Sequence, residues 1–428
     1  MELIGNCHRG KMNMGLFLRN KQNYLDSVEW LSKNSTHLSK PTECTIKDFE
    51  FLRSVLKNKR IVWLGENGHN IREHNLMKSK IIEFLYKEMD FKILTFESGL
   101  VECYSANYLK ENFTAKELLR NSIYSLWATE ENLPLFQLIK ESDLNLIGMD
   151  INPSSNPDIF LQFIRQLNHL VSQEVIEKIE YIESNVFKWY YRIGQYTAKR
   201  KKVPVEILKE FTDFKEKTST SINDLKAYLR EQCVLHSEDT EVTYKFKIII
   251  RCLQNRLYFI HHINNNHRTY KKLRETMMKE NLEWICNELY PDEKIIIWAH
   301  NLHIFKNYKT LTRFEPLGSL VSDRIKEQSY YLGLFMYQGE TQTDMGQPYK
   351  ISKPPKKSLE DYMHQVQSPT LFTDFLQLEK NSLNKWIFNK TIFLESGTMQ
   401  TLFRPRKQID GALFIESISP PEYLKRSE

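Results

Sequence analysis

The sequence lacks the cysteine pattern of disulfide-rich or zinc-binding proteins. Its six cysteines are scattered through 428 residues, and no two of them form a C-x-x-C pair. This spacing argues against a zinc knuckle, a redox pair or the dense disulfide framework of small secreted domains, and it favours a reducing compartment. The N-terminus is basic but has no apolar run long enough for a secretory signal. We therefore expect a cytoplasmic protein.

Long hydrophobic runs and strong charge are also missing. No stretch of about 18 uncharged apolar residues occurs. The most apolar candidate, residues 247–263, contains Lys247, Arg251 and Arg256, and we interpret it as a buried amphipathic helix. The net charge of +6 is spread along the chain. We therefore expect no membrane partner and no nucleic-acid partner, and nothing in the sequence indicates an oligomeric state.

Several well-known catalytic motifs are absent. The chain has no G-x-S-x-G, H-E-x-x-H, P-loop or G-x-G-x-x-G sequence, which argues against a nucleophile-elbow serine hydrolase, a zincin and the common nucleotide-binding folds. His69, Glu73 and His74 miss the H-x-x-E-H spacing by one residue, and 261-HHINNNH-267 is more typical of the polar end of a helix than of a metal site. We predict neither a metal nor a cofactor.

What is present is the alternation typical of an α/β fold. Apolar, β-branched runs alternate with helical periodicity from residue 61 to residue 150, and this pattern resumes at residue 294. Residues 158–290 show helical periodicity without strand signals. The predicted fold class is therefore α/β, a largely parallel mixed sheet core flanked by helices, with a substantial helical insertion. The predicted parts are the first part of the catalytic core (1–157), the helical insertion (158–290) and the second part of the core (291–428).

The individual elements follow from the same periodicities. We expect residues 340–375, which are rich in polar and turn residues, to form a mobile loop over the site. The aromatic content of 12% has two explanations, core packing or an apolar cleft for a bulky ligand. The predicted helices are residues 22–36, 45–58, 71–89 and a helix near 131–141, and the predicted strands are residues 61–65, 92–98, 144–150, 294–299, 329–339, 391–397 and 412–418.

Acids and imidazoles follow four of the predicted strands. They are Glu66 and His69 after the first strand, Glu97 at the end of the second, Asp150 at the end of the third, and His300 and His303 after the strand at 294–299. Because ligands of open α/β sheets bind beyond the carboxyl ends of the strands, we expect these side chains to lie along one edge. Gly65 and Gly68 would let the backbone turn sharply there.

This set of side chains suits proton transfer. A neutral imidazole is a good base near pH 7, and a neighbouring carboxylate fixes its tautomer and raises its basicity. We predict that His69, held by Glu97 or Glu66, removes a proton from a water that attacks a carbonyl, while His300 holds the carbonyl oxygen or the water. No serine or cysteine is placed as a nucleophile. Each residue alone also has a structural explanation, such as a helix cap, a salt bridge or a loop contact.

The same residues resemble the erythromycin esterase family. The likeness rests on 65-GENGH-69, 94-LTFES-98, 147-IGMDI-151, 298-WAHNLHI-304 and 410-DGALFIES-417, which span nearly the whole chain. It implies an α/β core with an added helical portion and ester hydrolysis by a histidine-activated water without a metal, macrolide lactone opening being the known resistance activity. It implies His69 as the base, Glu66 and Glu97 as flanking acids and His300 as the second histidine, with Arg274 and His303 near the substrate.

Two positions depart from the family pattern. The family commonly has a small residue directly after the histidine and an arginine nine positions after it, where this chain has Asn70 and Lys78. A lysine keeps the charge but lacks the planar fork with which arginine clamps a carboxylate or an oxyanion. The substrate can therefore differ from a 14-membered macrolide. Lys78 and Asp150 complete the substrate-binding residues that we predict.

The predicted function is that of a carboxylic ester hydrolase. Its expected partner is a small-molecule ester or lactone, for example a macrolide such as erythromycin. Two alternatives stay open at this point. One is a metal-dependent hydrolase or a haem-binding protein of the same architecture. The other is a non-catalytic accessory protein with a worn site, for which Lys78 is the best argument.

Overall fold

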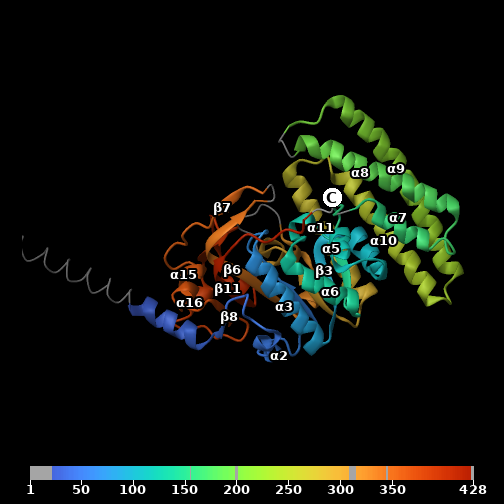
Figure 1. The fold of residues 1–428 in the computed structure, drawn as a ribbon. Helices are drawn as coiled ribbons and strands as arrows, with labels where there is room; N and C mark the ends of the chain where they lie inside the picture. Colours follow the sequence, from blue (N-terminus) through green and yellow to red (C-terminus); the bar gives the residue numbers. More distant parts are fainter. Residues whose placement is uncertain (1–21, 155, 198–200, 308–314, 344–345, 426–428) are drawn as a thin grey trace, which may run out of the picture. The chain divides into compact units, whose positions relative to one another are not determined.

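The computed structural model describes residues 22–154, 156–197, 201–307, 315–343 and 346–425 (Figure 1). By the density of contacts the chain divides into two compact units. Unit 1 comprises residues 1–89, 299–312 and 326–422, and unit 2 comprises residues 90–298, 313–325 and 423–428. The three domain-like parts that we predict from the sequence, with boundaries after residues 157 and 290, stay a prediction.

The sheet of unit 1 is mixed. Its three central strands are parallel, with β6 lying between β2 and β11. Strand β8 pairs with β11 in the antiparallel direction, and β1 is antiparallel to β8. Strand β7 is antiparallel to β6. All four residues of β2 are buried, as expected for a central strand of a parallel sheet. The strands are β1 (Thr36–Leu38), β2 (Ile61–Leu64), β6 (Ser329–Gln342), β7 (Pro348–Lys350), β8 (Thr370–Asp374) and β11 (Gly411–Ile418).

Helix α3 (Arg72–Met89) follows β2 and begins the crossover to the next part of the chain. Its start is fixed from outside the helix, because the N–H of Arg72 donates to the Ser419 carbonyl at 3.0 Å. The carboxylate of Glu73 accepts from both the backbone N–H and the hydroxyl of Ser419 at 2.7 Å each. Glu73 therefore ties the helix to the end of β11.

The strands of unit 2 are parallel. Strand β3 (Phe91–Gly99) lies between β5 (Lys294–Trp298) and β4 (Asn145–Asp150), and the side chains of β3 are almost entirely buried. Helices α4 (Leu100–Tyr108), α5 (Ala115–Ser122) and α6 (Leu133–Glu141) connect β3 to β4. Thr114 and Glu117 form a capping box at the start of α5, which explains why that helix begins there.

The rest of unit 2 is largely helical. Arg256 on α10 is buried and binds the buried carboxylates of Glu102 and Glu183 at 2.7 Å, which joins α10 to α4 and α8. No helix in the described ranges is long and apolar enough to cross a membrane. These helices are α7 (Asp158–Gln166), α8 (Gln173–Thr197), α9 (Val205–Leu235), α10 (Thr240–His262) and α11 (His267–Trp284), followed by a π-helical turn (Ile285–Leu289). The predicted fold class, a mixed sheet flanked by helices with a helical insertion, is confirmed.

Two sequence-based predictions of elements are wrong. Residues 340–375 are not one long loop, because they contain the end of β6, then β7, α15 (Leu359–His364) and β8. The helix at 45–58 is broken into two short turns. The strand predicted at 391–397 is observed as β9 (Thr391–Glu395), which pairs with β10 (Met399–Phe403) in a separate two-stranded sheet.

Residues 22–33 are helical, and the remaining elements are short. They are the turns Ile46–Phe49, Lys110–Asn112, Ser125–Trp127 and Glu130–Asn132 and the helices α2 (Leu52–Val55), α12 (Asn301–Ile304), α13 (Leu317–Leu320), α14 (Asp323–Glu327), α16 (Lys385–Phe388) and α17 (Pro405–Gln408).

Candidate active site

A buried carboxylate contacts a histidine and a lysine in unit 1. Glu66 Oε1 lies 2.7 Å from His69 Nδ1, and Glu66 Oε2 accepts from Lys78 Nζ at 2.9 Å. The side chains of Glu66 and Lys78 are 1% and 0% exposed, whereas that of His69 is 22% exposed. Of these three side chains, the His69 imidazole is therefore the one that solvent or a ligand can reach.

The charge of Glu66 fixes the tautomer of His69. Burial opposes ionisation of the Glu66 carboxyl, but the charge of Lys78 and the hydrogen bond with His69 outweigh it and lower its pKa to about 2. An ionised carboxylate can only accept hydrogen bonds. In the neutral imidazole the proton must therefore be on Nδ1 of His69, and Nε2 carries the free electron pair that a general base needs.

The loop after β2 brings these groups into position. A Cβ atom on Gly65 would lie 2.0 Å from the Asn301 side-chain oxygen, so only glycine permits this close approach. Gly68 has φ +122°, a conformation that side chains rarely adopt, and it turns the chain before α3. The backbone N–H of Asn301 donates to the Glu66 carbonyl at 2.8 Å. Gly68 therefore makes the sharp turn that the sequence predicts, whereas Gly65 is required by the close approach of Asn301.

His300 is held beside His69. Its Nδ1 accepts from the backbone N–H of Leu302 at 3.1 Å, as the N-cap of α12, and its ring centroid lies 5.1 Å from that of His69. Because Nδ1 accepts, neutral His300 carries its proton on Nε2. Glu395 Oε1 lies 3.8 Å from this nitrogen, a charge contact too long for a hydrogen bond. His300 therefore presents a donor where His69 presents an acceptor.

The other predicted residues of unit 1 lie close by or behind this pair. The ring of His303 is 6.5 Å from that of His300 and nearly perpendicular to it. Lys78 contacts Glu66 from the buried side. The sequence left open whether the residue at position 78 clamps a carboxylate or an oxyanion. The contact of Lys78 with Glu66 fits the first of these two roles. Unit 1 thus brings together Glu66, His69, Lys78, His300 and His303.

Unit 2 brings the remaining predicted residues together. Arg274 Nε lies 2.9 Å from Asp150 Oδ2 and 3.1 Å from its Oδ1, and Arg274 Nη2 lies 3.0 Å from Glu97 Oε1. Tyr124 also donates to Asp150 at 2.9 Å. Burial disfavours the charged Arg274, but Asp150 and Glu97 outweigh it and raise its pKa. The catalytic role of Glu97 and the substrate-binding roles of Asp150 and Arg274 stay predictions.

Sequence reasoning missed two residues that belong to these clusters. Glu395 is the last residue of the apolar strand β9, and Glu97 lies two residues before the end of β3, so the same strand-end signal could have identified Glu395. Tyr124 could not have been found in this way, because it lies between short helical segments with no periodic pattern.

The metal-like histidine spacing has a structural explanation. Glu73 binds Ser419, and His74 is buried, which lowers the pKa of its imidazole to about 4 and keeps it neutral at pH 7. Across the described ranges no group of three or more His, Cys, Asp or Glu side chains is arranged to hold a metal ion.

The geometry of unit 1 provides a base and a hydrogen-bond donor side by side. The Nε2 electron pair of His69 can take a proton from water, and the ionised Glu66 can stabilise the imidazolium that results. The Nε2–H of His300 can donate to an oxygen that gains negative charge. This arrangement needs no nucleophilic side chain.

Known proteins resemble this chain over much of its length. The chain is 28% identical over 427 residues to the putative hydrolase YbfO of Bacillus subtilis, covering 92% of each chain. It is 22% identical over 321 residues to the erythromycin esterase type II of Escherichia coli, covering 69% of this chain and 73% of that one. Family membership of such relatives supports a hydrolase.

Solved structures share the fold. A Bacillus cereus protein matches with a TM-score of 0.77 at 17% identity, over 94% of this chain and 99% of that one. A mutant of the erythromycin esterase EreC in its open conformation matches with a TM-score of 0.65 at 16% identity, over 92% and 99%. The family model described as Erythromycin esterase matches residues 86–418, which include Glu97, His300 and His303 but begin after His69. The chain therefore belongs to the erythromycin esterase family.

Proposed function

We propose that this protein is a carboxylic ester hydrolase that opens or cleaves an ester or lactone with a water activated by His69. The observation that carries the proposal is the contact of His69 Nδ1 with the buried, ionised Glu66, which places the basic electron pair of a partly exposed imidazole on Nε2. Family membership supports the same reaction class.

The proposed reaction has two proton transfers. His69 Nε2 takes a proton from water while the water oxygen attacks the carbonyl carbon and forms a tetrahedral oxyanion. The imidazolium, stabilised by Glu66, then gives that proton to the leaving alkoxide as the carbon–oxygen bond breaks. The products are a carboxylic acid and an alcohol, or for a lactone one ring-opened molecule that has gained one water.

His300 is proposed to stabilise the oxyanion. Its Nδ1 is occupied by the Leu302 N–H, so its Nε2–H is the group available to donate, and its ring lies 5.1 Å from that of His69. A preorganised donor aimed at a developing charge typically contributes about 10²–10³-fold in kcat. Glu395, 3.8 Å from this nitrogen, favours a positive charge on His300 during the reaction.

Macrolides are the first substrates to test. Two Escherichia coli relatives carry the name erythromycin esterase. Lys78 stands where the family commonly has an arginine. It is fully buried and bound to Glu66, so a lysine at this position changes how the Glu66 carboxylate is held. On this argument Lys78 excludes neither turnover nor a macrolide substrate.

We also propose that the reaction needs no metal and takes place in the cytoplasm. His69 is the base that activates the water in this proposal, a task that the metal ion performs in metal-dependent hydrolases. The five described cysteines are unpaired and four of them are buried, which suits a reducing compartment. Activity that persists after exhaustive chelation would support the first point. Stoichiometric zinc or manganese with loss of activity on chelation would favour the metal-dependent alternative.

The decisive experiment is mass spectrometry of erythromycin and of simple aryl esters after incubation with the protein. We expect a gain of one water for at least one compound. His69→Ala should lower kcat by about 10²–10⁴-fold, the usual contribution of a general base. His169→Ala, which removes an exposed histidine of unit 2, is the matched control and should keep wild-type turnover. A folded His69→Ala protein with near-normal activity would refute the assignment, and no turnover of any compound would favour an accessory protein.

A further inference from the structure

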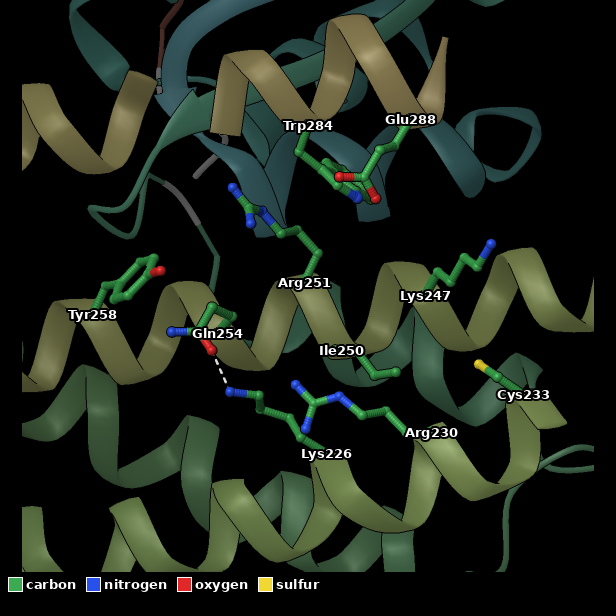
Figure 2. Close-up of a pocket in the computed structure, with 10 residues that line it drawn as sticks. All are labelled: Lys226, Arg230, Cys233, Lys247, Ile250, Arg251, Gln254, Tyr258, Trp284 and Glu288. Carbon is green, nitrogen blue, oxygen red and sulfur yellow. Dashed lines mark hydrogen bonds between the residues drawn. The ribbon is translucent and has the colours of Figure 1, made fainter. Parts of the chain in front are cut away.

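Unit 2 contains a cavity of about 450 Å³ between helices α9 and α10 and the end of α11. Figure 2 shows its lining, with Lys226 and Arg230 reaching up from α9 and Arg251 reaching from α10 toward Trp284. We call this space the basic cavity. Its charged lining residues are Lys226, Arg230, Lys247, Arg251 and Glu288, and its aromatic ones are Tyr258 and Trp284.

Four cations and a single carboxylate line the basic cavity. Lys226 and Arg230 are four residues apart on α9, and Lys247 and Arg251 are four apart on α10, so each pair shares one face of its helix. Like charges at this spacing destabilise a helix. In the described ranges no ion pair joins any of the four to a carboxylate. The fold therefore concentrates positive charge here, and Glu280 and Glu288 offset only part of it through their effect on Arg251.

Lys226 is the most buried of the four cations. Its side chain is buried, at 5% exposure, and its ammonium donates to the amide oxygen of Gln254, a neutral group (Figure 2). Burial, followed by the charges of Arg230 and Arg251, lowers the pKa of Lys226. Both arginines therefore lie near enough to Lys226 for their charges to act on it.

Arg251 keeps an unused donor. Its Nε donates to Asn281 at 2.9 Å, and its guanidinium lies over the Trp284 ring, 5.4 Å from the ring centroid. Its Nη2 is buried and has no hydrogen-bond partner in the described part of the chain. A buried charged donor without an acceptor costs free energy, and an anion in the cavity would satisfy it once the guanidinium turned toward that anion.

We propose that the basic cavity binds a small phosphorylated ligand. Two arginines offer forked donors that match phosphate oxygens, and two lysines add point charges. The volume is that of a small-molecule site, larger than one phosphate group, so it leaves room for an organic part. The side chains of Ile250, Tyr258 and Trp284 provide apolar surface for that part.

The position of the cavity separates this proposal from the proposed hydrolysis. None of the residues predicted for catalysis or substrate binding lines it. Trp284 directly precedes a π-helical turn, Ile285–Leu289, and Glu288 lies within it; turns of this kind occur frequently at functional sites. Binding here is therefore a property of the helical part of unit 2 and does not depend on the reaction at His69.

The test is isothermal titration calorimetry of the full-length protein with sodium pyrophosphate and, separately, with ADP. We expect saturable one-to-one binding of at least one of them, weakening as salt is raised because the exposed cations are screened. Arg230→Gln and Lys247→Gln remove exposed cations and should each raise Kd about 10-fold, the effect of one charge-assisted contact. Both side chains are exposed, so folding should be preserved.

The matched control is Lys217→Gln. Lys217 is an exposed lysine on α9, nine residues before Lys226 and therefore on the opposite helix face, and it does not line the cavity. Its loss should change Kd by less than about twofold, as for an ordinary surface charge. No saturable binding of either compound would overturn the proposal. An equal weakening by Lys217→Gln would also overturn it, since it would show attraction to the general surface charge.

Discussion

The pH dependence of stability is the sharpest test of the buried charge cluster in unit 1. In wild type the folded-state pKa of Glu66 is about 2, against an ordinary value of 4.5. A depressed folded-state pKa stabilises the protein fully above the unfolded-state value, and this contribution is lost as the pH falls from 4.5 to 2. Glu66→Gln keeps the shape of the side chain and removes its titration. The variant should therefore lose less stability in acid than wild type does.

The size of the difference follows from the two pKa values. From pH 6 to pH 3 the unfolded state takes up a proton at Glu66 while the folded state stays almost unprotonated. This interval ends 1.5 pH units below the unfolded value, and at 1.36 kcal/mol per unit wild type loses about 2 kcal/mol through this one group. Over its whole range the shift corresponds to about 3 kcal/mol. Glu66 is 1% exposed, so solvent screening is small.

The assay is urea unfolding, followed by circular dichroism, of wild type and Glu66→Gln at pH 6, 5, 4 and 3. The two curves of unfolding free energy against pH should converge by about 2 kcal/mol between pH 6 and pH 3. At pH 6 the variant itself should be about 3–5 kcal/mol less stable, because the buried cation of Lys78 loses the carboxylate of Glu66. Glu66→Gln/Lys78→Met, which removes both charges, should recover part of that loss. Parallel curves for wild type and Glu66→Gln would refute the reasoning.

Two further predictions concern unit 2. Arg256→Met leaves the buried Glu102 and Glu183 carboxylates without their counter-charge, so the free energy of unfolding should fall by about 3–5 kcal/mol in urea titrations at pH 7. The deficit should shrink as the pH is lowered and the carboxylates become protonated, and a deficit that does not change with pH would contradict this account. Arg274→Lys keeps the charge but loses the fork on Asp150, and it should cost about 1.5–3 kcal/mol, measured in the same way. A neutral effect would show that the fork adds nothing.

The local pattern of the sequence predicts the central strands well. Strands β2, β3, β4, β5, β6 and β11 coincide with the predicted runs to within a few residues. Their side chains are buried on both faces, so each reads as a short apolar, β-branched run that no other element imitates. The helical insertion was predictable for a similar reason, since its long segments keep a helical period.

The segment after β6 could not be predicted in the same way. Strand β8 has only five residues, Thr370–Asp374, and two of its buried positions are threonines, Thr370 and Thr373, so no apolar run marks it. Its partners β1 and β11 are far from it in the sequence, and register with distant strands is information that local periodicity lacks. The prolines and polar residues around it therefore suggested a loop.

The candidate site was predictable in its residues and only partly in its contacts. The strand-end rule identified Glu66, His69 and His300, and unit 1 places them together. The sequence left open whether Glu66 or Glu97 holds His69, and Glu66 is observed in hydrogen-bond contact with its Nδ1. The burial of Lys78 could not be read from its position on an amphipathic helix, because most lysines on such helices face solvent.

The opposed tautomers of His69 and His300 impose a polarity on whatever molecule lies between them. One ring offers an electron pair and the other offers a proton, so the preferred occupant both gives and receives a hydrogen bond. Water meets that requirement, and so does any small alcohol. Nothing in the two rings distinguishes between them except size. In a mixture of water and methanol, the proposed reaction should therefore transfer the acyl group to methanol in a fraction of the turnovers, yielding a methyl ester beside the acid.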